Sequence, residues 1–220
     1  NRHAKTLAGW HELVVNGARR GPDRLLLRLS ANEDLLHDAY GLVADAVKRG
    51  RRITPAAEWL LDNYHLIEEQ IRIARRHLPR GYSRELPQLR NGPYAGYPRT
   101  YAIALELISH VDGRLDAESV RAFVASYQSV APLRLGELWA IPIMLRLALL
   151  ENLRRVTARV ASGRRHRERA AHWVERMLEV AVAAPARVVL ELAEMVKENP
   201  PLTTAFVTEF ASRMQGQGMA

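Results

Sequence analysis

The sequence predicts an all-α protein, a bundle of about seven to nine helices with one long loop rich in glycine, proline and tyrosine. Apolar residues recur three and four positions apart along most of the 220 residues, the period of a helix buried on one side. Alternating strand patterns and internal repeats of fixed period are missing. Proline, glycine and helix-capping residues separate the helical stretches. We therefore predict one α-helical domain over residues 1–220.

Two helices are expected before residue 53. The stretch Leu7 to Val15 has apolar residues at helical spacing, and Asn16-Gly17 should end it. Ser30 or Asn32 is then a suitable cap for a helix whose apolar face continues to Gly50.

The clearest helical pattern follows Thr54, an N-cap residue, and begins with Pro55, since proline suits the first helical turn. One apolar stripe is expected to be buried: Leu60, Tyr64, Ile67, Ile71, Ala74 and Leu78. A polar stripe runs beside it: Glu58, Asp62, His65 and Glu69. Such a face could bind a metal only if a second helix supplied matching ligands, and the sequence has no partner Glu-x-x-His motif. An ion-pair face is the favoured interpretation, and no metal site is predicted.

Residues 79–98 form the long loop, which contains four prolines, three glycines and three tyrosines. Loops of this length in compact domains are usually functional or disordered, and tyrosines favour an ordered loop because their rings can pack. The rings could also stack on sugars, although anchoring the loop over the bundle is the simpler role. The candidates for contact with a carbohydrate or another domain are the polar stripe together with Trp59, Tyr82, Tyr94, Tyr97 and Tyr101.

The second half of the chain again shows helical patterns with clear boundaries. They are Tyr101 to Ile108, a helix capped by Asp116 and closed by Pro132, Gly136 to about Ala161, Ala171 to Ala183, Pro185 to Lys197, and a last helix capped by Thr203 or Thr204. The stretch from Gly136 is apolar nearly all round through Leu150, which predicts a central core helix. Ser162-Gly163 is expected to break it.

The charge is strongly basic, +8 with no cysteine, which favours anionic neighbours and excludes disulfides and thiolate metal sites. A dense group of arginines is the candidate anion-contact surface: Arg154, Arg155, Arg159, Arg164, Arg165, Arg167 and Arg169. It could meet phosphate, anionic lipid or nucleic acid, but no recognition-helix unit for DNA is evident and no nucleic acid is expected. A solvated helix end is the competing interpretation.

Motifs for nucleophilic or nucleotide chemistry are missing, so no catalytic residue is assigned. No apolar stretch is long enough to span a bilayer, and the chain taken alone is expected to be soluble.

Several long sequence segments resemble those of the cyclic β-1,2-glucan synthases, large bacterial inner-membrane glucosyltransferases. They are AEWLLDNYHLIEEQI, LPRGYSRELPQL, GPYAGYPRTYAIA, SHVDGRLD, ELWAIPIMLRLALLENLRR and NPPLTTAFV. They occur within residues 53–210, the family-like helical core, whereas residues 1–52 match less distinctly.

The resemblance implies a parent enzyme that uses UDP-glucose and a divalent cation. The Asp-x-Asp and Gln-x-x-Arg-Trp motifs of such transferases are absent from this chain. We therefore expect a noncatalytic scaffolding region on the cytoplasmic side of the membrane, ahead of the membrane-embedded transferase and without a cofactor of its own. Its expected partners are the transferase and membrane regions of the polypeptide; β-1,2-glucan and anionic lipid are further candidates.

Overall fold

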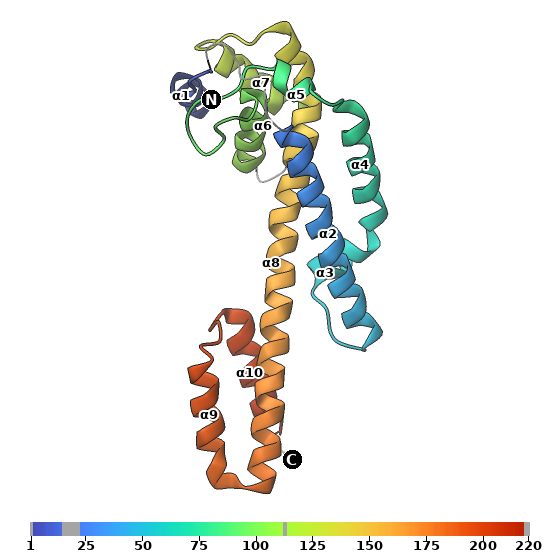
Figure 1. The fold of residues 1–220 in the computed structure, drawn as a ribbon, viewed down its shortest axis with the longest axis vertical. Coiled ribbons are helices and arrows are strands. Elements are labelled where there is room, and N and C mark those ends of the chain that lie inside the picture. Colours follow the sequence, from blue (N-terminus) through green and yellow to red (C-terminus); the bar gives the residue numbers. More distant parts are fainter. Residues whose placement is uncertain (1, 15–22, 112–113, 218–220) are drawn as a thin grey trace. The chain divides into compact units, whose positions relative to one another are not determined.

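The computed structural model describes residues 2–14, 23–111 and 114–217 (Figure 1). Within these ranges every regular element is a helix, and the isolated bridges pair Leu13 with Leu89 and Gln88 with Pro98. The all-α prediction is confirmed, with ten α-helices and one 3₁₀ helix in the described part of the chain. The predicted helix stop at Asn16-Gly17 lies outside the described residues.

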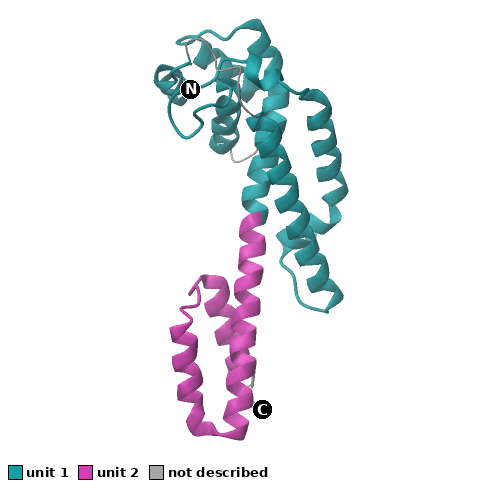
Figure 2. Ribbon diagram, in the orientation of Figure 1, with its two compact units in different colours: residues 1–157 teal, residues 158–220 magenta. Residues whose placement is uncertain are grey.

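The chain packs as two compact units, residues 1–157 and 158–220, each described by itself (Figure 2). Unit 1 contains α1 (Arg2–Trp10), α2 (Arg24–Lys48), α3 (Pro55–Asp62), α4 (Tyr64–His77), α5 (Tyr82–Glu85), α6 (Arg99–His110) and α7 (Ala117–Gln128). Unit 2 contains η1 (Pro185–Arg187), α9 (Val188–Lys197) and α10 (Thr204–Gln217). Helix α8 (Leu135–Ala183) gives its first part to unit 1 and its last part to unit 2. The prediction of a single domain stays a prediction.

The first two helices begin earlier than predicted. Helix α1 ends at Trp10, because the backbone of the residues after it bonds to the long loop instead: the Val14 amide donates to the Gln88 carbonyl at 2.9 Å. Helix α2 begins at Arg24, where the Asp23 carboxylate accepts from the Leu26 amide at 3.3 Å. Asn32, predicted as a cap, is buried within the helix.

The apolar stripe of the third predicted helix is buried throughout, as predicted from its spacing. The Thr54 cap and Pro55 at the first turn are also confirmed, since the Thr54 hydroxyl accepts from the Ala57 amide at 3.3 Å. The helix is nevertheless divided into α3 and α4 at Asn63. The Asn63 side chain donates to the Trp59 carbonyl at 2.8 Å and so competes with the regular helical bonds at this turn.

One hydrophobic cluster in the core of unit 1 forms where α1, α6, α7 and the start of α8 meet. Its buried residues are Ala4, Ala8, Ile103, Leu107, Phe123, Tyr127 and Leu133. Helix α6 buries residues on all sides, including the polar Arg99 and Thr100 at its start. Asp116 caps α7 as predicted, accepting from the Ser119 amide at 2.7 Å.

Helix α8 continues through Ser162-Gly163, so the predicted break there is wrong, as is the separate helix predicted from Ala171. A glycine within a helix costs only about 1 kcal/mol, which tertiary packing can offset. Within unit 2, a β-carbon on Gly163 would lie 3.9 Å from that of Ala205 on α10, an ordinary packing distance.

Unit 2 is a small helical hairpin with its own core. Ala170, Trp173 and Met177 on α8 pack with Met195 on α9 and Phe206 on α10. The predicted split at Pro185 is confirmed, and Thr203 caps α10 through a hydrogen bond from the Phe206 amide. Among the described residues, none of the helices combines the length and apolarity needed to cross a bilayer.

Candidate functional site

The long loop ends on a buried ion pair. Arg99, 5% exposed, donates from Nε to Glu137 Oε1 at 2.6 Å and from Nη2 to Glu137 Oε2 at 2.7 Å. The guanidinium also donates to the Pro132 carbonyl at 2.8 Å, and the Arg134 amide donates to Glu137 Oε2 at 2.9 Å. This fork-to-carboxylate geometry satisfies both groups and fixes the start of α6 against the start of α8.

The network continues from Arg99 to Tyr127 and His11. Burial works to lower the pKa of Arg99, but hydrogen bonds to Glu137 and Tyr127 raise it overall, so the arginine is charged. Tyr127 Oη lies 2.9 Å from His11 Nδ1. Burial, with the nearby Arg99 charge, lowers the pKa of His11 to about 4. His11 is therefore neutral at neutral pH, and its ring shares a hydrogen bond with the Tyr127 hydroxyl, which also interacts with the charged Arg99.

A second buried carboxylate, Glu151, lies on α8 beneath the tyrosine that follows the loop. Its oxygens accept from Arg28 Nε at 2.8 Å, Arg28 Nη2 at 2.5 Å and Arg154 Nη2 at 2.9 Å. Burial opposes ionisation, yet the hydrogen bonds from Arg28 and Arg154 lower the pKa of Glu151 to about 2. Burial, reinforced by the Glu151 charge, raises the pKa of Tyr101. Each of these two buried carboxylates, Glu137 and Glu151, thus binds an arginine that is far from it in the sequence.

The loop itself is ordered and folded back on itself. The Leu89 amide donates to the Tyr97 carbonyl at 2.9 Å, and the Gly96 amide donates to the Leu89 carbonyl at 2.7 Å. Gly96 has a φ of +80°, and a β-carbon there would lie 2.5 Å from Nη1 of Arg24, which donates to the Ala95 carbonyl. Only glycine fits this turn without displacing the arginine.

The predicted tyrosines play unequal parts. Tyr101 is buried and packs beside Tyr97, with ring centroids 5.5 Å apart, while Tyr82, Tyr94 and Tyr97 are half-buried. Tyr101 and Tyr97 therefore have the simpler of the two predicted roles, which is to anchor the loop on the helices.

Sequence reasoning missed Trp10, which is 62% exposed and would contact a β-carbon on Gly92 at 3.4 Å. Asn91 ties the two segments together by donating to the Trp10 carbonyl at 2.7 Å and accepting from the Glu12 amide at 3.1 Å. This places an open aromatic face against the tip of the loop. No local pattern links Trp10 to a loop about eighty positions later, so only the folded chain reveals it.

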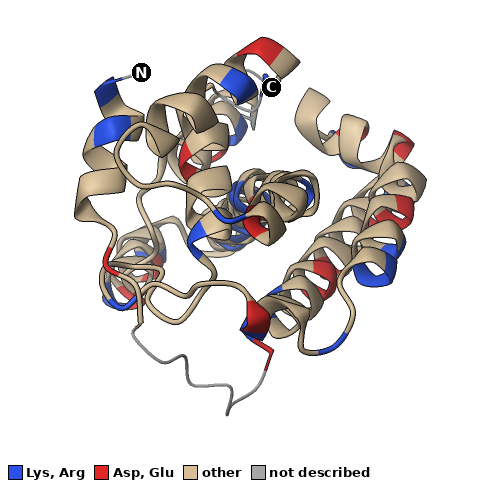
Figure 3. Cartoon of the chain, turned by 90° about the horizontal axis from the view of Figure 1, so that it is seen from above, with Lys and Arg blue, Asp and Glu red and all other residues tan. Residues whose placement is uncertain are grey.

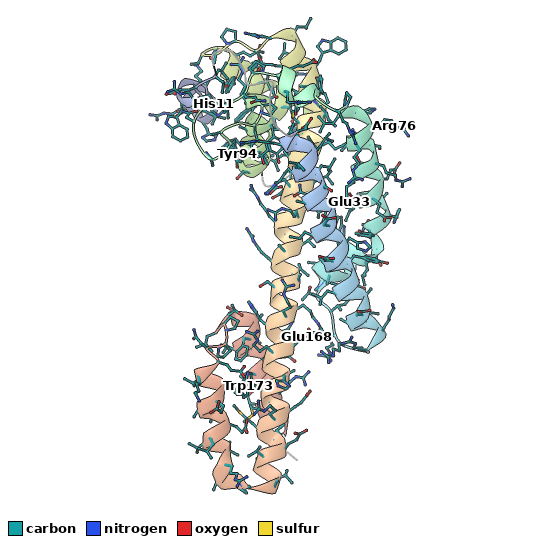
Figure 4. The ribbon with its side chains drawn as sticks, in the orientation of Figure 1. His11, Glu33, Arg76, Tyr94, Glu168 and Trp173 are labelled. Carbon is teal, nitrogen blue, oxygen red and sulfur yellow. The ribbon has the colours of Figure 1, made fainter. Side chains whose placement is uncertain are left out.

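The polar stripe lies elsewhere. Glu58, Asp62, His65 and Glu69 are exposed on α3 and α4, as is Trp59. About 12 Å of helix lies between Glu69 and the end of α4 at His77, at about 1.5 Å per residue, and the loop begins only after it. Figure 4 shows Arg76 on α4 and Glu33 on α2 on one side of unit 1 and Tyr94 on the other. The structure thus does not bring the stripe and the tyrosines together.

Helices α2 and α4 enclose a groove of about 410 Å³ that sequence reasoning also missed. Its lining residues are Glu33, Asp34, His37, Asp38, Tyr64, Glu68 and Ile71. The Tyr64 hydroxyl, among these lining groups, is 3.2 Å from His37 Nδ1, and its ring stacks on Tyr40. In the described parts of the chain, no three carboxylate, imidazole or thiol groups converge as a metal site would require, so no step is assigned to a divalent cation.

Within the described residues, some arginines of the predicted group form ion pairs and others show none. Arg154 and Arg155 pair with Glu151, and Arg164 is buried and pairs with Glu168. Arg159, Arg165 and Arg169 are exposed, and Arg167 is half-buried. Basic and acidic positions are interspersed along the helices as a whole (Figure 3).

No family model matches the chain. A curated protein does: the chain is 35% identical over 194 residues to cyclic beta-(1,2)-glucan synthase NdvB of Rhizobium meliloti (strain 1021). The aligned region covers 88% of this chain but 7% of that relative. The alignment thus covers nearly all of the two helical units described above. By this similarity the chain belongs to the cyclic β-1,2-glucan synthase family, as a region matching a small part of the full-length relative.

Proposed function

We propose that the chain is a noncatalytic helical region of a cyclic β-1,2-glucan synthase that uses UDP-glucose, and that it docks on the rest of that polypeptide on the cytoplasmic side of the inner membrane. The binding of UDP-glucose and of a divalent cation is assigned in this proposal to the transferase region of the parent. The observation that carries it is the apolar surface of α9 in unit 2.

Helix α9 buries little of its apolar surface within unit 2. Met195 is its one buried residue, whereas Val189, Leu190, Leu192 and Val196 are between 42% and 71% exposed. Val189, Leu192 and Val196 are three and four positions apart and share one face. Contiguous exposed aliphatic side chains of this kind mark interaction surfaces. The family relationship supports the rest of the synthase as the partner.

The test is the double variant Val189→Ser/Val196→Ser in the synthase polypeptide that carries this chain. We expect unit 2 to become more sensitive to limited proteolysis and glucan synthesis from UDP-glucose to fall severalfold, because two apolar contacts of about 1 kcal/mol or more each are lost. The matched control is Val47→Ser/Val156→Ser, which changes two half-exposed valines of unit 1. Wild-type protection and activity in the α9 variant would contradict docking, and glucosyl transfer by the isolated chain would contradict a noncatalytic role.

Contact with the glucan is a second candidate function, favoured by the exposed Trp10 face. Indole rings offer a flat apolar platform for the C–H face of a sugar. Titrating β-1,2-gluco-oligosaccharides into the isotope-labelled chain should shift the NMR signals of the Trp10 indole and the Gly92 amide. Trp10→Ala should abolish the response, whereas Trp59→Ala, which removes a similarly exposed indole, should keep it. The site would be refuted if no NMR signal shifted at millimolar sugar, or if the largest shifts were those of Trp59.

A further inference from the structure

Unit 2 carries several arginines for which the structure shows no ion pair among the residues it describes, and two of them lie together on one face of α8. Arg165 and Arg169 are exposed and lie one helical turn apart on α8, and the exposed His172 follows on the same face. The structure shows no ion pair for either arginine among the residues it describes. We call Arg165, Arg169 and His172 the basic edge.

Neighbouring arginines of unit 2 are engaged. Arg164 pairs with Glu168 at 3.1 Å, and Arg176 pairs with Glu191 at 2.6 Å. Arg213 pairs with Glu209 at 2.6 Å and with Glu175 at 3.3 Å. Four carboxylates of unit 2 are thus paired with other arginines, and Arg165 and Arg169 are exposed to solvent.

An exposed aliphatic side chain lies close to this edge. Thr203 Oγ1 is 2.9 Å from Nδ1 of His166, which holds the segment before α10 against the turn of α8 that carries Arg165. Leu202, next to Thr203, is 74% exposed. A cationic surface with a projecting leucine suits the boundary between lipid headgroups and acyl chains.

In the described part of unit 2, no tryptophan or phenylalanine side chain is exposed. Trp173 and Phe206 are buried in the core, and Figure 4 shows Trp173 directed between the helices of the unit. Proteins that bind single-stranded nucleic acid stack successive bases on exposed aromatic rings, whereas in the described part of unit 2 the exposed ring of this surface is the imidazole of His172 and Phe210 is half-buried. A guanidinium group can donate two hydrogen bonds to two oxygens of one phosphate, and anionic lipid headgroups present such phosphates.

We propose that the basic edge, with Leu202 beside it, binds the anionic surface of a lipid bilayer. This goes beyond docking on the synthase polypeptide: it uses side chains of α8 and the segment before α10, whereas docking uses the exposed face of α9. Failure of one proposal therefore leaves the other standing.

Co-sedimentation of the full chain with vesicles tests it. We expect binding to vesicles of equimolar phosphatidylcholine and phosphatidylglycerol that weakens as salt rises, and little binding to pure phosphatidylcholine. Arg165→Gln/Arg169→Gln should lower the partition coefficient about fivefold for each arginine, roughly 25-fold together. Leu202→Ser should lower binding in physiological salt as well, because it removes the aliphatic contact.

The matched control is Lys48→Gln/Arg49→Gln, which removes two exposed charges from unit 1 and should leave binding within about twofold of wild type. Circular dichroism should show equal helix content in all variants. The proposal is overturned if the arginine variant sediments like wild type, if the control variant loses binding equally, or if binding ignores lipid charge. If a single-stranded oligonucleotide bound more tightly than the vesicles through the same arginines, the ligand of the basic edge would be nucleic acid and the lipid proposal would be wrong.

Discussion

Replacing Glu137 with alanine is expected to lower the free energy of unfolding by about 3–5 kcal/mol, the usual cost of removing one partner from a buried ion pair. Arg99 is 5% exposed and cannot turn its guanidinium to water, so the variant retains an uncompensated buried charge. The Arg134 amide loses its acceptor too. Urea denaturation at neutral pH measures the change.

Two further variants separate the ion pair from other effects. Glu194→Ala removes an exposed carboxylate paired with Lys197, and should cost no more than about 1 kcal/mol. Arg99→Met/Glu137→Leu removes both charges and should recover much of the stability lost by Glu137→Ala, because the two substitutions are strongly coupled. A loss below about 1 kcal/mol in Glu137→Ala would show that Arg99 finds another partner or water.

The presence of a helix could be predicted from the sequence where apolar spacing, caps and breakers all agreed. A helix boundary could not be predicted where it depended on one local residue and on tertiary packing. The stripe from Leu60 to Leu78 is buried because its period is repeated over several turns. The break at Asn63 depends on a single side-chain hydrogen bond. The expected break at Ser162-Gly163 does not occur, because one unfavourable glycine is a small cost within a long packed helix.

The ion pairs of the two buried carboxylates could not be predicted from spacing, since Arg99 and Glu137 are 38 residues apart and Arg28 and Glu151 are 123 apart. A signal was present all the same. Glu151 directly follows an apolar run, and Arg99 begins a helix whose other early residues are apolar or small. Charged residues in such positions need a buried partner, although the sequence does not say which. The polar stripe attracted attention because it is periodic, but it is exposed.

Replacing Glu151 with glutamine is expected to cost about 1–3 kcal/mol at neutral pH, less than the loss of Glu137. The carboxylate is 1% exposed, but its main partner Arg28 is 37% exposed and can turn toward water when the charge is removed. Glutamine keeps the shape and one acceptor oxygen, so the variant should fold. Thermal or urea denaturation beside wild type measures the difference.

The same variant should change how stability depends on acid. The pKa of Glu151 is about 2 in the folded chain against an ordinary value of 4.5, so between these values the unfolded carboxylate binds the proton first. Its contribution is therefore full above about pH 4.5 and is lost as pH falls toward about 2. The stability difference between wild type and Glu151→Gln should shrink over that window. His11 takes up a proton on unfolding between pH 6.5 and about 4, which is above the window of Glu151. This uptake destabilises the wild type and Glu151→Gln by the same amount, so it cancels in their difference. A difference that stays constant from neutral pH down to the acid limit of folding would mean that Glu151 is not held ionised by Arg28 and Arg154.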